Sequence, residues 1–110
     1  MTRKQLTYLS VGVMSFLVTA TAARADAIDG NWCRSDGKRM SIRGSEIVTP
    51  GGSKIMGDYS RHFFSYVVPS GEAGAGNKVA ITLLNEHLAH AREGNAPTIQ
   101  EWRRCQADVS

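Results

Sequence analysis

Short runs of β-branched and aromatic residues alternate with turn-forming clusters along most of this chain. The clearest run has Val79, Ile81 and Leu83 on one side and Ala80 and Thr82 on the other. This period of two is typical of a strand with one buried face. The same criteria predict eight strands, at Asn31–Cys33, Arg39–Ile42, Glu46–Thr49, Lys54–Tyr59, His62–Val68, Lys78–Leu84, His87–Arg92 and Ile99–Cys105.

Turn signals separate these runs, among them Ser35-Asp36-Gly37, Thr49-Pro50-Gly51-Gly52 and Glu93-Gly94-Asn95. Short connections between consecutive strands favour an antiparallel meander. So many short strands in a small chain indicate a barrel or a strongly curled sheet. The predicted fold class is therefore all-β, as a small antiparallel meander or barrel-like domain.

One segment also fits a helix. Leu84, Leu88 and Ala91 lie at i, i+4 and i+7, and good helix formers fill the segment up to Gly94. A helix near residues 85–93 would make the fold α+β. We favour the strand, because Asn85-Glu86 forms a natural hairpin tip between two apolar runs.

The first 25 residues have the features of an export signal. Arg3 and Lys4 precede an uncharged apolar run, Leu6–Ala20, and Ala23-Arg24-Ala25 offers the small residues that signal peptidase requires. Cleavage after Ala27 is a second possibility. The apolar run is too short for a convincing membrane span, which needs about 20 apolar residues.

The predicted organisation is a signal peptide at 1–25 and a single β-rich domain at 26–110. We expect the mature protein to be periplasmic or secreted, without a membrane span after cleavage.

Cleavage changes the charge of the protein. The formal charge is +3, but Arg3, Lys4 and Arg24 lie in the predicted signal and all ten Asp and Glu follow it, which leaves the mature chain neutral. A neutral domain lacks the basic field that nucleic-acid binding requires, so we expect no nucleic-acid partner.

Cys33 and Cys105 are the two cysteines of the chain. In an oxidising compartment they predict a disulfide between the first and last strands. Closing a loop of about 72 residues would stabilise the fold by about 4 kcal/mol. A reactive thiol and an intermolecular bridge are the alternatives.

The sequence offers little for catalysis, metals or cofactors. His87 and His90 would point to opposite faces of a strand, which excludes one ion bound by both. Gly71, Gly74 and Gly76 lead into a strand and not into the helix N-terminus that phosphate-binding loops need. No nucleophile–base motif is present, so we expect no enzyme, no metal and no cofactor.

The segment Asp58–Tyr66 contains four aromatic rings, an arginine and a histidine. If Phe63 faces the core, the alternating residues of the strand form an outward stripe. Tyr and Arg are enriched in interface hot spots. The candidate partner-binding residues are Tyr59, Arg61, His62 and Tyr66. The alternative is that the rings fill the core and Arg61-His62 only caps a turn.

The chain resembles a group of short exported proteins of alphaproteobacteria in four motifs: Gly30-Asn31-Trp32-Cys33, Thr49-Pro50-Gly51-Gly52, Gly57-Asp58-Tyr59-Ser60-Arg61-His62 and Glu101-Trp102-Arg103-Arg104-Cys105. That resemblance implies no catalytic residue and no ligand. The chain is also similar, more faintly, to periplasmic lysozyme inhibitors of the small β-barrel type. Their Ser-Gly-x-x-Tyr loop is half matched, by Ser70-Gly71, with Gly74 where the tyrosine would stand.

The sequence thus predicts a non-enzymatic binding domain that recognises a periplasmic protein or a component of the cell envelope. The alternative function is inhibition of a cell-wall hydrolase, through the loop that contains Ser70 and Gly71.

Overall fold

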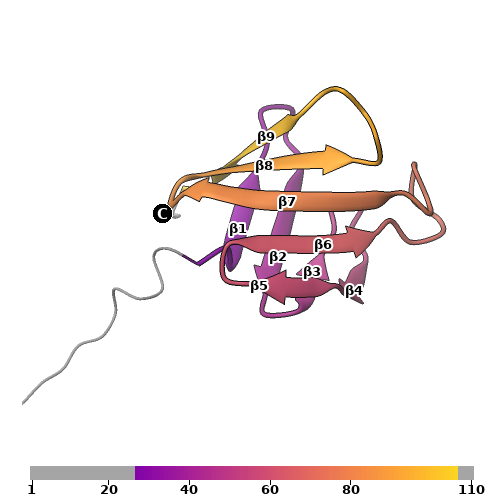
Figure 1. Cartoon of the computed structure of the whole chain (residues 1–110), viewed down its shortest axis with the longest axis horizontal. Coiled ribbons are helices and arrows are strands. Elements are labelled where there is room, and N and C mark those ends of the chain that lie inside the picture. The colour runs from indigo at the N-terminus through magenta and orange to yellow at the C-terminus, as the bar shows by residue number, and fades with distance from the viewer. Residues whose placement is uncertain (1–26, 107–110) are drawn as a thin grey trace, which may run out of the picture.

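The computed structural model describes residues 27–106, which form nine antiparallel strands and no helix (Figure 1). The predicted signal peptide at 1–25 lies outside the described residues. The strands are β1 (Gly30–Cys33), β2 (Arg39–Arg43), β3 (Glu46–Val48), β4 (Lys54–Met56), β5 (Asp58–Ser60), β6 (Phe63–Val67), β7 (Lys78–Asn85), β8 (Leu88–Glu93) and β9 (Gln100–Arg104).

All nine strands belong to one sheet, in the order β4-β3-β2-β1-β9-β8-β7-β6-β5. The sheet has two halves, β1–β4 and β5–β9, and within each half strands that follow one another in the chain are neighbours. The halves meet where β1 pairs with β9. The sheet curls into a nearly closed barrel, which confirms the predicted all-β fold class. Figure 1 shows β1–β4 crossing behind β5–β8 at a steep angle.

The barrel lacks one pairing, between the edge strands β4 and β5, although the chain runs directly from one to the other through Gly57. The Gly57 N–H donates to the Ser45 carbonyl at 2.8 Å. A Cβ at this position would lie 2.4 Å from the Ser65 carbonyl oxygen and 2.7 Å from the Phe64 ring. The prediction of one strand over Lys54–Tyr59 is therefore wrong: the chain bends at the one residue that can approach β6 so closely.

The helix considered near residues 85–93 does not form. Residues Glu86 and His87 make a tight turn, in which the His87 N–H donates to the Asn85 side chain at 2.8 Å. β8 follows, and its Ala89 and Ala91 are buried against the core. The segment forms a strand and not a helix because β8 pairs with β7 on one side and β9 on the other, which satisfies the hydrogen bonds of its backbone N–H and C=O groups.

The core fills the inside of the barrel and contains both tryptophans, Trp32 beside Cys33 and Trp102 on β9. Its buried hydrophobic residues are Ile28, Trp32, Met40, Ile42, Ile47, Phe64, Tyr66, Val68, Val79, Ile81, Ala89, Ala91 and Trp102.

The orientation of β6 is the reverse of the one considered from the sequence. Phe64 and Tyr66 point into the core, at 0% and 6% exposure, whereas Phe63 is 38% exposed. Neighbouring aromatics at positions 63 and 64 make either face of this strand apolar, so the pattern alone did not fix which face is buried.

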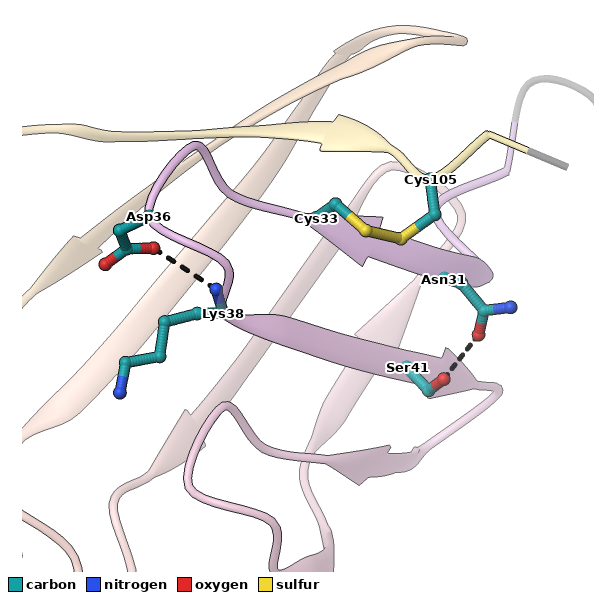
Figure 2. The surroundings of a disulfide bond; sticks show 6 residues. All are labelled: Asn31, Cys33, Asp36, Lys38, Ser41 and Cys105. Carbon is teal, nitrogen blue, oxygen red and sulfur yellow. Dashed lines mark hydrogen bonds between the residues drawn. A yellow bond between two sulfur atoms is a disulfide. The ribbon is translucent and has the colours of Figure 1, made fainter. Parts of the chain in front are cut away.

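The predicted disulfide is present. Cys33 on β1 and Cys105 just after β9 are bonded, with their Cα atoms 5.1 Å apart (Figure 2). The same view shows the Ser41 hydroxyl donating to the Asn31 side chain, across the pair β1–β2. The bridge therefore joins the two halves of the sheet beside the pairing of β1 with β9.

No helix within residues 27–106 has the length and apolar character needed to cross a membrane.

Candidate functional site

An open groove of about 880 Å³ lies at one end of the barrel, where the chain enters β1. Its walls come from the segment before β1, the turn between β2 and β3, β5 with the residue that follows it, and the end of β9. The charged and aromatic residues that line it are Asp29, Arg43, Tyr59, Arg61 and Arg104.

Asp29 organises this groove. One of its carboxylate oxygens accepts the Tyr59 hydroxyl, and the other accepts the Gly44 N–H at 2.8 Å. The hydrogen bond with Asp29 is the main reason that the pKa of Tyr59 lies above its usual value, since it stabilises the protonated phenol. The Asp29 carboxylate thus joins the Tyr59 side chain of β5 to the turn between β2 and β3.

Arg104 closes the floor of the groove. Its Nη1 donates to the Asp29 carbonyl at 2.7 Å, its Nη2 to the Ala27 carbonyl at 3.0 Å, and its Nε to the Glu86 carbonyl at 2.6 Å. Gly30 makes this approach possible, because its φ of 134° and its missing Cβ leave room for the guanidinium. A side chain of β9 therefore holds the segment before β1, while the disulfide joins the other end of β1 to the residue after β9.

Two of the four candidate partner-binding residues meet in this groove. Tyr59 is 38% exposed on one wall, and Arg61 is exposed beside it. The backbone at Arg61 also holds the entering segment, since its carbonyl accepts the Ile28 N–H at 2.8 Å.

The other two candidates lie elsewhere. His62 is exposed in the turn between β5 and β6 and lines a separate hollow of about 220 Å³ with Leu83, Leu84, Asn85 and Glu86. Tyr66 is buried in the wall of the barrel near its opposite end. The four residues therefore do not form one continuous surface.

Sequence reasoning missed three residues of the groove: Asp29, Arg43 and Arg104. By sequence alone, Arg103 and Arg104 next to Glu101 would be expected to face solvent or to pair with an acid. Arg103 does pair with Glu101, at 3.2 Å, but Arg104 binds backbone carbonyls instead. No sequence motif joins positions 29, 43, 59 and 104. The pairings of β1 with β2 and β9 bring positions 29, 43 and 104 together, and the curl of the sheet brings Tyr59 of β5 to Asp29.

The loop that contains Ser70 and Gly71 lies at the opposite end of the barrel, between β6 and β7 (Figure 1). Ser70 and Gly71 are exposed. Glu72 holds this loop in place, because its carboxylate accepts the Thr49 and Ser53 hydroxyls, both at 2.6 Å. These two hydrogen bonds, that from Ser53 first, lower the pKa of Glu72.

Within the part of the chain that the structure describes, no group of three or more His, Cys, Asp or Glu residues is arranged to hold a metal ion. His87 instead lies 3.5 Å from the neighbouring Glu86 carboxylate, on the surface.

A comparison of the chain with protein-family models, with curated proteins and with solved structures gave no significant match.

Proposed function

We propose that this protein is an exported, non-enzymatic binding domain that holds an acidic group of a protein partner in the groove organised by Asp29. The observation that carries this proposal is the convergence of Arg43, Arg61 and Arg104 on one open groove that contains a single carboxylate, Asp29. The mature chain as a whole is neutral, so this local excess of cations is a feature of the groove.

The exposed side chains of the groove suit recognition. Arginine presents a planar fork of donors that matches a carboxylate, and Tyr59 offers a rigid amphipathic ring beside it. The hydrogen bonds from Gly44 and Tyr59 to Asp29 already fix two walls of the groove. Few side chains therefore lose conformational entropy when a partner binds.

The chemistry of the groove favours binding over catalysis. None of the described residues that line it is a histidine or a cysteine. Its one carboxylate, that of Asp29, accepts hydrogen bonds from Tyr59 and Gly44 and so holds the walls of the groove together.

The proposed location is the periplasm or the exterior of the cell. The apolar start of the sequence, with its Ala23-Arg24-Ala25 motif, favours export, and the Cys33–Cys105 disulfide suits an oxidising compartment.

Affinity capture with the oxidised, exported protein tests this proposal. The baits are the unaltered protein, the groove variant Arg43→Ala/Arg61→Ala, and the matched control Arg39→Ala/Arg92→Ala, which removes two exposed arginines elsewhere. A protein held by the unaltered bait and the control, but lost by the groove variant, supports the proposal. Equal capture by all three baits contradicts it.

Two further readouts refine this result. The His62→Ala variant should capture the same partner as the unaltered protein, since His62 lies outside the groove. If only cell-wall or lipid material is retained, the ligand is an envelope component, and the assignment to a protein partner is wrong.

We propose inhibition of a cell-wall hydrolase such as lysozyme as the second candidate. Its support is the exposed loop with Ser70 and Gly71, which Glu72 fixes to Thr49 and Ser53. A fixed protruding loop can enter an active-site cleft at little entropic cost. A lysozyme activity assay with a large excess of the protein decides this; an unchanged rate of cell-wall hydrolysis excludes the second candidate.

A further inference from the structure

A second cavity, of about 330 Å³, opens at the barrel end opposite the groove. This volume is at the small end of the range of about 300–1,000 Å³ that is typical of ligand pockets. Buried apolar side chains form its inner wall: Met40, Val68, Val79, Ile81, Ala91 and Trp102.

Polar side chains form the rim of this barrel-end cavity. Arg34 and Lys38 balance the charges of Glu72 and Glu93. Each rim acid has a fixed position, since Glu72 accepts two hydroxyls and Glu93 accepts the Asn77 amide at 3.0 Å. These four charges sum to zero, and Asp36, which pairs with Arg34, adds one negative charge beside them. The rim therefore does not favour a net anion, and the apolar wall behind it disfavours a net cation.

Arg34 lies over Trp102, with its guanidinium carbon 5.1 Å from the ring centroid. Two hydrogen bonds to Asp36, at 2.8 and 3.0 Å, hold the guanidinium there. The charge of Arg34 is therefore already paired with Asp36. The inner part of the cavity is left with an apolar lining of aromatic and aliphatic side chains.

Tyr66 supplies a polar group to this apolar wall. The residue is only 6% exposed, and within residues 27–106 its hydroxyl has no hydrogen-bond partner. Buried hydroxyls are almost always paired, with protein, water or ligand, so this hydroxyl is available to an acceptor atom that enters the cavity.

The environment of Tyr66 also fixes its role in a hydrogen bond. Burial, followed by the charges of Glu72 and Glu93, raises its pKa to about 12. The phenol therefore stays protonated at any physiological pH and is available as a donor.

We propose that the barrel-end cavity binds a small, uncharged cyclic or aromatic molecule that carries an accepting oxygen, with the ring against Val68 and Val79 and the oxygen bound by the Tyr66 hydroxyl. This site is separate from the groove at Asp29, so either proposal can fail without the other.

Binding of two matched probes to isotopically labelled protein, followed by NMR, tests this inference. Acetophenone carries a ring and a carbonyl oxygen, and toluene carries the ring without the oxygen. We expect both to shift the methyl signals of Val68 and Val79, with acetophenone bound about fivefold more tightly because of one hydrogen bond.

Two variants test whether the difference in affinity between the probes comes from the Tyr66 hydroxyl. Tyr66→Phe should bind both probes equally, whereas the control Tyr59→Phe, in the groove, should keep the fivefold preference. If Tyr66→Phe does not fold, the comparison of the two probes on the unaltered protein still decides whether an oxygen acceptor is recognised.

Several results would overturn the inference: no binding of either probe, equal binding of both to the unaltered protein, shifts confined to the groove, or a preference that survives in Tyr66→Phe. Tighter binding of benzoate than of acetophenone would also overturn it, since the site would then select an anion.

Discussion

The guanidinium carbon of Arg104 lies 4.4 Å from the centroid of the Trp32 ring. The two residues also face each other across the pairing of β1 with β9. Because the same guanidinium donates to the carbonyls of Ala27, Asp29 and Glu86, one side chain joins three segments of the barrel. This contact stands beside the Cys33–Cys105 bridge and supports the same junction.

Replacement of Arg104 by lysine should destabilise the domain. Lysine keeps the charge but lacks the planar fork that stacks on Trp32 and reaches three carbonyls, so we expect a loss of about 2 kcal/mol. Denaturant unfolding measures it. The control Arg103→Lys affects an exposed ion pair with Glu101 and should cost less than about 1 kcal/mol. Equal losses in the two variants would show that the Arg104 contacts add nothing.

Removal of the disulfide should have a larger effect. The bridge closes a loop with a sequence separation of 72 residues. The chain-entropy model gives about 4 kcal/mol for a loop of this length. Unfolding curves of the Cys33→Ser/Cys105→Ser variant, and of the unaltered protein with and without a reductant, measure this loss. A reductant that changes the unaltered protein but not the double variant confirms that the bridge is the cause.

Gly57→Ala should be among the more damaging glycine substitutions in the chain. Its new methyl group would overlap the Ser65 carbonyl at 2.4 Å and the Phe64 ring at 2.7 Å. We expect a loss of about 3 kcal/mol from overpacking at this bend. Gly76→Ala serves as the control, since its Cβ would meet nothing within 4 Å and only its φ of 92° is strained, which costs about 1 kcal/mol. Thermal unfolding in which Gly76→Ala is the worse variant would contradict the role given to Gly57.

Alkaline pH should reveal the burial of Tyr66. Its pKa rises from 10.0 to about 12 on folding. Below pH 10 both states carry the neutral phenol, so the contribution to stability is complete there. As the pH rises from 10 towards 12, the unfolded chain ionises first, and stability falls by about 2 kcal/mol.

The comparison with Tyr66→Phe isolates this effect from that of other groups. The variant should lose less stability than the unaltered protein between pH 10 and 12, as measured by denaturant unfolding. Ultraviolet titration of tyrosinate should likewise lose its most alkaline transition in the variant. Parallel stability curves for the two proteins over this range would refute the assignment.

Most strands of the barrel could be predicted from the sequence, because the alternation of apolar and polar residues that marks a strand is a local pattern. The run from Val79 to Leu83 alternates cleanly, and β7 forms there. The bend at Gly57 was missed because a glycine inside a strand pattern does not reveal what backbone will approach it. Two residues of the groove, Tyr59 and Arg61, were predicted because they are close together in sequence, whereas Asp29 reaches them only through the curvature of the sheet.

The meeting of the first and last described segments has a topological consequence. The Cys105 N–H donates to the Asn31 carbonyl at 3.0 Å, and Arg104 holds Ala27, so the chain leaves the barrel where it enters it. A domain of this kind can be inserted into a surface loop of another protein without separating the loop ends. It can also be circularly permuted, with its ends joined and new termini opened near Gly74 in the exposed loop between β6 and β7.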